Sequence, residues 1–199
     1  MVFKDSISGK CLYKQYVKNE TNKLYLSAIK EIVRRGIKVQ AIICDGRKGL
    51  FQLFGDIPVQ MCQFHQVQII NRYLTRKPKT QAAIELRALS LTLVKSDKAS
   101  FITALAHWQH TWENYLKERT INPLTQKSHY THKRLRSAWL SLKRNLPWLF
   151  VFEDYKERMI PNTTNALDGS FADLKNKLRN HNGLSTARKK KLIDGFFKA

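Results

Sequence analysis

The segment that most constrains the fold is a short apolar run, Val39 to Cys44, followed directly by Asp45 and Gly46. An apolar run of this length that ends in a turn signal predicts a buried β-strand. A carboxylate at the carboxyl end of such a strand stands on a rigid base beside an open loop, which makes Asp45 a candidate metal ligand. An ordinary strand-to-helix turn with Asp as a helix cap explains the same residue equally well.

The segments on either side predict a mixed order of strands and helices. Met1–Asp5 and Lys10–Val17 are expected to form a β-hairpin. Thr21 is expected to cap a helix that ends at Gly36. A short helix around Leu50 to Phe54 and a strand from Val59 to Phe64 follow. The expected order of elements is therefore β, β, α, β, α, β.

From His65 to about residue 145 the pattern changes to that of an all-helical block. The amphipathic stretches are Val67–Leu74, Gln81–Val94 and Phe101–Glu118. Trp108, Trp112 and Tyr115 fall at helical spacing, which favours core packing over a surface that stacks nucleic-acid bases.

The carboxyl-terminal part of the chain predicts two further helices. The polar loop Pro161–Asn165 leads into a helix from Ala166 to Arg179, and a basic helix follows from Ser185. We find no internal repeat and no low-complexity linker that would divide the chain. A single domain is expected.

Charge indicates the class of partner. The chain of 199 residues has 36 Lys and Arg against 15 Asp and Glu, a net charge of +21. Such an excess favours a polyanion, most simply nucleic acid. No apolar run approaches the length of a spanning helix, so we expect no membrane partner. The odd set of three cysteines, Cys11, Cys44 and Cys62, suits a reducing compartment and a cytoplasmic protein.

Asp168 is the second candidate metal ligand, in the first turn of the helix after Pro161–Asn165. The helix dipole alone also favours an acid there. Two divalent ions held by carboxylates can activate a nucleophile and stabilise a leaving oxygen in phosphoryl transfer. Mg²⁺ and Mn²⁺ prefer oxygen ligands, so Asp45 and Asp168 suit them, whereas Cys62 does not.

Cys62 and His65 have a zinc-like spacing, and His129 with His132 could supply two more ligands to a tetrahedral site. The alternative is that Cys62 ends a buried strand and that His65 caps a helix or supports the active site through hydrogen bonds. We favour this alternative and do not expect zinc.

The ordered set of motifs resembles bacterial insertion-sequence transposases of the Mutator-like DDE group. The motifs are Asp45-Gly46, Cys62-Gln-Phe-His65, Asn162-Thr-Thr-Asn165 with Asp168-Gly169, and His181-Asn-Gly183. Among these transposases, the chain is similar to the variant whose full-length members carry an amino-terminal zinc-binding segment.

The resemblance implies an α/β (α+β) fold with a ribonuclease H-like core and a helical insertion. The implied core comprises residues 1–66 and about 149–182, the insertion about 67–148, and a basic helix residues 185–198. The implied activity is Mg²⁺- or Mn²⁺-dependent cleavage and strand transfer of double-stranded DNA at element ends, by a homo-oligomer.

By motif, Asp45 matches the second acid of the catalytic triad and Asp168 the third. Glu is usual at the third position, and Asp shortens its reach by one methylene. Cys62, His65 and Asn165 match residues that support the site. DNA contacts are expected from the basic clusters, at Lys133, Arg134, Arg136, Lys175, Lys177, Arg179, His181, Lys189 and Lys190.

The first acid is not evident. The implied fold needs three antiparallel strands before its first helix, and only two precede Thr21. We interpret Asp5 as a turn residue and expect the first acid upstream of Met1, together with a DNA-recognition region. If Asp5 is instead the first acid, the triad is complete. The alternatives to an active transposase are a remnant that binds DNA without chemistry and an RNA-binding or ribonuclease protein, the latter without a supporting aromatic motif.

Overall fold

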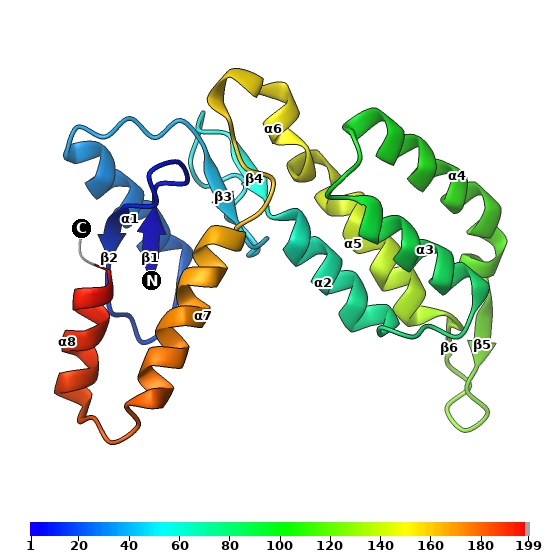
Figure 1. Ribbon diagram of the computed structural model, residues 1–199. Coiled ribbons are helices and arrows are strands. Elements are labelled where there is room, and N and C mark those ends of the chain that lie inside the picture. The colour runs from blue at the N-terminus through cyan, green and yellow to red at the C-terminus, as the bar shows by residue number, and fades with distance from the viewer. Residues whose placement is uncertain (198–199) are drawn as a thin grey trace. The chain divides into compact units, whose positions relative to one another are not determined.

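A computed structural model describes residues 1–197 and shows an α+β protein (Figure 1). Its residues divide into two compact units. Unit 1 comprises residues 1–42, 48–58 and 164–199, and unit 2 comprises residues 43–47 and 59–163. The last residue of the predicted basic helix 185–198 lies outside the described residues.

Unit 1 begins with the predicted hairpin. Strands β1 (Val2–Lys4) and β2 (Cys11–Lys14) pair antiparallel, with Phe3 opposite Tyr13. The turn between them is closed by Asp5, whose carboxylate accepts a hydrogen bond from the Ser8 backbone N–H at 2.9 Å. Asp5 is therefore a turn residue in this structure.

Helix α1 (Asn22–Arg34) follows as the capping signals predict. The Thr21 side chain accepts a hydrogen bond from the Leu24 N–H at 3.3 Å, and Gly36 has a φ of +82° just beyond the helix. The helix buries Ala28, Ile29 and Ile32. The prediction of this helix is confirmed.

The helix predicted around Leu50 to Phe54 is wrong, because this segment consists of turns. Gly49 and Gly55 enclose it with φ values of +84° and +60°. Left-handed residues at both ends leave too few positions for a helical hydrogen-bond ladder. Leu50 and Phe54 are nonetheless buried.

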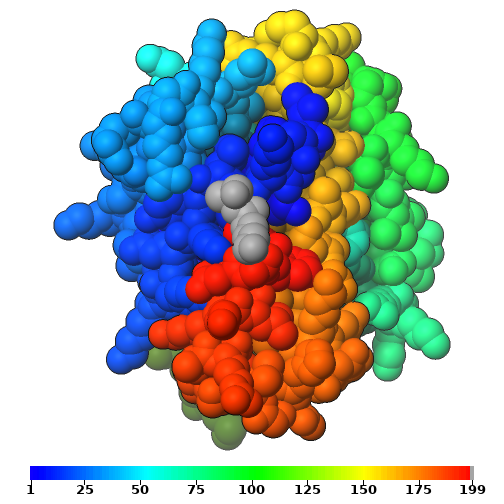
Figure 2. Space-filling view, turned by 60° about the vertical axis from the view of Figure 1, so that its left-hand side comes forward, coloured from blue at the N-terminus to red at the C-terminus, as the bar shows by residue number. Residues whose placement is uncertain are grey.

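Unit 1 is completed by α7 (Asn165–Asn180) and α8 (Thr186–Phe196), which confirm the two predicted carboxyl-terminal helices. Leu174 and Phe197 pack on Cys11 in a small core. Figure 2 shows α8 (red) beside α7 (orange), with the amino-terminal hairpin in blue next to them.

Strands β3 (Ile42–Cys44) and β4 (Val59–Met61) form a second two-stranded sheet. The Ile42 N–H donates to the Pro58 carbonyl at 2.9 Å and the Cys62 N–H donates to the Cys44 carbonyl at 2.8 Å. From the first bond to the second, the residue numbers increase along both strands, so the strands are parallel.

Both strands are shorter than predicted. Of β3 only Cys44 is buried, so the expectation of a buried strand over Val39 to Cys44 holds only at its end. Strand β4 stops at Met61 instead of Phe64 because helix α2 (Gln63–Leu74) begins two residues later. The Cys62 to His65 motif therefore lies at a strand-to-helix junction.

The remainder of unit 2 is mostly helical. Helices α2, α3 (Gln81–Thr92) and α4 (Lys98–Lys117) confirm the three amphipathic stretches. They are followed by α5 (Lys133–Leu149), α6 (Val151–Asp154) and a 3₁₀ turn, η1 (Lys156–Arg158).

The aromatic residues of α4 belong largely to this packing. Trp108 is buried and its Nε1–H donates to the Ala82 carbonyl at 3.1 Å. Trp112 is half-buried and donates to Glu85 Oε2 at 2.7 Å. The expectation of core packing is confirmed for Trp108.

The all-helical prediction for this region is wrong at one place. Strands β5 (Arg119–Ile121) and β6 (Ser128–Tyr130) form an antiparallel hairpin between α4 and α5. Each strand has three residues and no alternation of apolar and polar side chains, so the sequence carries little signal for it.

The described residues thus form three separate two-stranded sheets. Two strands precede α1, as the sequence indicates, and the ribonuclease H-like core stays a prediction. No helix within residues 1–197 combines the length and apolar character needed to cross a membrane.

Candidate functional site

Asp45 stands in the turn directly after β3, and its side chain is exposed. Its Oδ1 accepts a hydrogen bond from the Arg47 N–H at 3.2 Å. Gly46 follows with a φ of +89°, and a Cβ built on it would lie 2.5 Å from Met61 Cε. An ionised carboxylate that accepts one backbone hydrogen bond still has lone pairs for a metal ion.

Cys44, directly before this turn, is a poor metal ligand. Cys44 and Cys62 are both buried, and burial raises the pKa of the Cys44 thiol to about 11. A metal ion binds the thiolate, which is scarce at neutral pH when the pKa is so high. Cys62 serves as the N-cap residue of α2.

The candidate histidines of unit 2 occupy different structural positions. His65 is half-buried in the first turn of α2, and its ring forms a T-shaped pair with that of Phe64 at 6.1 Å between centroids. His132 stacks on Tyr115 at 3.6 Å, and its Nε2 lies 2.8 Å from Glu118 Oε2. Across residues 1–197 there is no group of three or more His, Cys, Asp or Glu arranged to hold a metal ion.

Three buried glutamines surround the strand-to-helix junction, and the sequence analysis missed them. Gln60, Gln63 and Gln66 have no exposed surface. The Nε2 groups of Gln60 and Gln63 both donate to the Leu149 carbonyl, at 2.9 and 2.8 Å. Gln66 donates to Ser141 Oγ at 3.2 Å and accepts from Asn145 Nδ2 at 2.7 Å. The regular spacing of three residues between these glutamines was the sequence signal that could have revealed them.

Asn162, at the start of the polar loop, belongs to this junction. Its carbonyl accepts from the Gln63 N–H at 2.9 Å, and its Nδ2 donates to Gln63 Oε1 at 3.0 Å and to the Val94 carbonyl at 3.3 Å. Because the N–H groups of a helix's first turn lack partners within the helix, Asn162 completes the start of α2. Its role in unit 2 is structural.

Asp168 lies in the first turn of α7, in unit 1, and is exposed. The Thr164 hydroxyl donates to Asp168 Oδ2 at 2.9 Å. Asn165 is the first residue of the helix and is also exposed. One turn later, Lys4 Nζ donates to Ser170 Oγ at 2.8 Å, which ties the start of α7 to β1.

Helices α7 and α8 carry most of the predicted DNA-binding residues, and we call them with the intervening loop the α7–α8 basic segment. Lys175, Arg179, His181 and Lys190 are exposed, and Lys189 is half-buried. Lys177 is exposed too, but it lies 3.5 Å from Asp173 Oδ2 and 5.0 Å from the centre of the Phe196 ring.

The basic residues at the start of α5 are used differently. Arg134 donates from Nε to the Tyr73 carbonyl at 2.7 Å and from Nη2 to the Arg72 carbonyl at 2.8 Å. It therefore satisfies carbonyl groups at the end of α2. Arg136 lies over the Tyr130 ring at 4.0 Å, whereas Lys133 is exposed.

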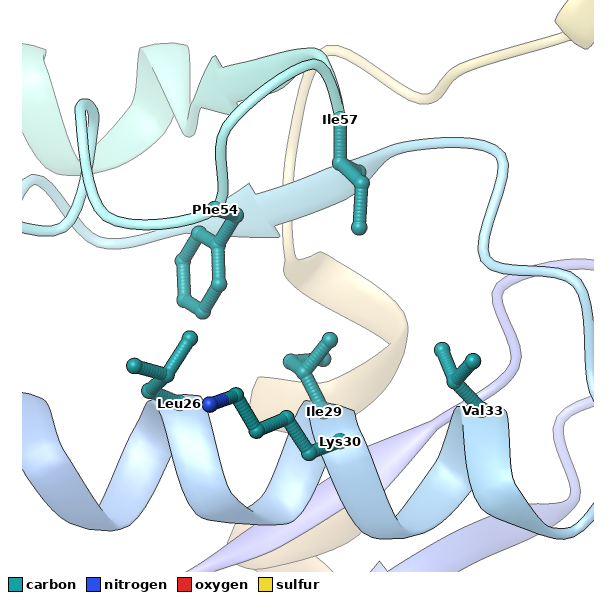
Figure 3. Close-up of a pocket in the computed structure, with 6 residues that line it drawn as sticks. All are labelled: Leu26, Ile29, Lys30, Val33, Phe54 and Ile57. Atoms are coloured by element: carbon teal, nitrogen blue, oxygen red, sulfur yellow. The ribbon is translucent and has the colours of Figure 1, made fainter.

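An apolar pocket of about 260 Å³ opens between α1 and the turn segment around Phe54. Figure 3 shows Phe54 and Ile57 facing α1, where Leu26, Ile29 and Val33 line the pocket and the Lys30 side chain lies between Leu26 and Ile29. The lining side chains are apolar apart from that of Lys30, and none of them is a carboxylate.

Comparison of this chain with protein-family models, with curated proteins and with solved structures found no match. The functional interpretation therefore depends on the residues themselves. Asp45 and Asp168 are both exposed carboxylates beside polar turns, in unit 2 and unit 1 respectively.

Proposed function

We propose that the chain is a DNA-binding transposase domain of the DDE type, which cleaves DNA and transfers strands at the ends of an insertion sequence. The observation that supports it best is the charge of the α7–α8 basic segment. Within this segment, residues 175–191 contain seven Lys and Arg and no Asp or Glu, and its three acids, Asp168, Asp173 and Asp194, lie outside that stretch. A continuous stretch of this kind suits the phosphate backbone of double-stranded DNA.

The chemistry is assigned by the motif resemblance. In this proposal Asp45 and Asp168 are ligands of Mg²⁺ or Mn²⁺, which supplies the charge that polarises the scissile phosphate. Cys62, His65 and Asn165 support the ligands, in a ribonuclease H-like core. The protein acts in the cytoplasm as a homo-oligomer assembled on DNA.

Binding is tested by the salt dependence of affinity for a labelled duplex, measured by fluorescence anisotropy. Lys189→Ala with Lys190→Ala should weaken binding and lower the slope of log K against log salt by about 1 for each phosphate that the variant no longer neutralises. The matched control is Lys117→Ala in unit 2, which removes a lysine paired with Glu113 at 2.7 Å. Equal slopes for all three proteins would contradict the assignment of the α7–α8 basic segment to DNA.

Catalysis is tested by nicking and strand transfer on duplexes that carry element ends, with Mn²⁺ and with a chelator. Asp45→Asn and Asp168→Asn should each abolish the metal-dependent product while leaving the affinity for DNA unchanged. Product formation by Asp45→Asn at the original rate would show that the metal-ligand assignment is wrong.

A non-catalytic DNA-binding protein is the second candidate. The charge of the α7–α8 basic segment supports it equally, because phosphate contacts do not require a metal site. This candidate predicts salt-sensitive binding that a chelator leaves unchanged, without any metal-dependent product. Displacement of the duplex by equal concentrations of RNA would instead favour an RNA-binding protein.

A further inference from the structure

The β5–β6 hairpin of unit 2 carries the most exposed large apolar side chain in the described part of the chain. Leu124, at its tip, is 93% exposed, and Ile121 at the end of β5 is 61% exposed. Figure 1 shows the hairpin extending beyond the ends of α4 and α5. Leu124 and Ile121 together give the hairpin an exposed apolar surface, which suits contact with a partner.

The tip is held in one conformation by its own hydrogen bonds. Asn122 Oδ1 accepts from the Leu124 N–H at 2.9 Å and from the Thr125 N–H at 3.2 Å. The Gln126 N–H donates to the Asn122 carbonyl at 2.9 Å, and Gln126 Nε2 donates to the Pro123 carbonyl at 3.0 Å. Leu124 is therefore presented on an ordered turn, and little conformational entropy remains to be lost on binding.

The base of the hairpin is anchored as firmly. The guanidinium groups of Arg119 and Arg136 lie 4.7 and 4.0 Å from the centre of the Tyr130 ring. Arg119 Nε also donates to Ser128 Oγ at 2.8 Å, across the two strands. The Thr131 N–H donates to the Glu118 carbonyl at 3.0 Å, which joins the hairpin to the end of α4. These contacts fix the hairpin to helices α4 and α5.

The charge of the hairpin and of the start of α5 indicates the partner. Residues 119–136 contain five Lys and Arg and no Asp or Glu, of which Arg119 and Lys127 lie in the hairpin and the others in the first turn of α5. An apolar protein surface offers no complement to this charge, whereas duplex DNA offers phosphates along the hairpin and stacked, apolar base faces at its tip. DNA-bending proteins insert apolar side chains such as Leu between base steps from the minor groove.

We propose that the β5–β6 hairpin is a wedge that enters the minor groove of duplex DNA and that Leu124 inserts between two base pairs, kinking the duplex. The exposed Lys127 and Lys133 contact the flanking phosphates. The inference rests on the proposed function in one respect, because it takes double-stranded DNA as the partner. Unstacking of the bases is offset by the additional phosphate contacts that a bent duplex permits.

The experiment measures bending as a change in energy transfer between dyes at the two ends of a duplex of about 30 base pairs, with flexible TA steps near its centre. The original protein should bend the duplex, and Leu124→Ser should lose most of the energy-transfer change. The matched control is Leu91→Ser, which alters a leucine of α3 that is 47% exposed. It should bend DNA as the original protein does.

A second readout does not depend on bending. A wedge prefers a duplex that is already easy to unstack, so the original protein should bind a duplex with a central mismatch more tightly than a matched one. Leu124→Ser should lose this preference while keeping the affinity that the α7–α8 basic segment provides. Thermal melting of Leu124→Ser should match that of the original protein, because the side chain is exposed.

The outcomes separate the two proposals. Duplex binding without bending, or bending that Leu124→Ser retains, would overturn the wedge and leave the proposed function standing. Failure of the original protein to bind any duplex would overturn the proposed function. Leu124-dependent binding to anionic lipid vesicles in place of DNA would assign the tip to a membrane surface and also overturn the wedge.

Discussion

Gln63 and Asn162 are joined by two hydrogen bonds, one from the Gln63 backbone N–H to the Asn162 carbonyl and one from Asn162 Nδ2 to Gln63 Oε1. The pair fixes the loop before residue 163 to the start of α2. Gln63 has no exposed surface, so loss of the Asn162 side chain would leave Gln63 Oε1 buried without this partner. Such a group costs about 1–3 kcal/mol.

We therefore expect Gln63→Ala and Asn162→Ala each to lower the free energy of unfolding by about 1–3 kcal/mol. The double variant should lose less than the sum, because the two side chains share a bond. Chemical denaturation of the four proteins measures this coupling. Asn182→Ala, an exposed asparagine between α7 and α8, is the control and should change little. Strict additivity would contradict the pairing.

Arg134 should affect stability more than DNA binding. Its guanidinium satisfies the carbonyls of Arg72 and Tyr73 at the end of α2, so Arg134→Ala should lower the free energy of unfolding by about 1 kcal/mol. Lys133→Ala, one residue earlier and exposed, should leave stability unchanged and lower the salt dependence of binding. Chemical denaturation and fluorescence anisotropy on both variants test this. Unchanged stability of Arg134→Ala together with weaker DNA binding would contradict the structural role of Arg134.

Glu31 should titrate far below an ordinary glutamate. Arg34 and then Arg35 donate to its carboxylate, and they lower its pKa from 4.5 to about 2. Because the folded pKa is depressed, the stabilisation is present above pH 4.5 and is lost as the pH falls toward 2. The carboxyl carbon of Glu31, followed by NMR, should titrate near the lower value. In the Arg34→Ala, Arg35→Ala variant the midpoint should rise toward 4.5, and an unchanged midpoint would exclude the two arginines as the cause.

Gly46→Ala should destabilise the turn that carries Asp45. The φ of +89° is strained for alanine, and the new Cβ would meet Met61 Cε at 2.5 Å. The Met61 side chain is flexible and can move away, so the strain in φ dominates, at about 1–2 kcal/mol. Gly195→Ala in α8 has open space at its Cβ and should stabilise the protein by a few tenths to about 1 kcal/mol. Thermal melting distinguishes the two, and equal effects would contradict the strain at Gly46.

The parts of the fold that the sequence predicted are those with a local chemical signal. Thr21 and Ser185 accept hydrogen bonds from Leu24 and Arg188 at the starts of α1 and α8, and such caps mark a helix start without knowledge of the tertiary structure. The β1–β2 hairpin was likewise marked by its turn residues. These elements appear within a residue or two of the predicted positions, except that β2 ends at Lys14, three residues before the predicted Val17.

Two features that were not predicted, the end of β4 and the buried glutamines, depend on contacts between distant residues. The early end of β4 is set by Asn162, which satisfies the Gln63 N–H so that a helix can begin there. The buried glutamines were missed because polar residues suggest a surface, whereas the Leu149 carbonyl provides their partner in the interior. The candidate acids were found from motifs, and their roles stay predictions.

The interleaving of the two units limits how the chain can be divided. Unit 2 includes residues 43–47, which are separated from the rest of it by residues 48–58 of unit 1. A fragment that starts at Val59 would lack Cys44, whose carbonyl receives the Cys62 N–H, and with it the strand beside β4. Any fragment meant to fold as the helical unit must therefore begin before residue 43, and genetic dissection by a single cut would damage both units at once.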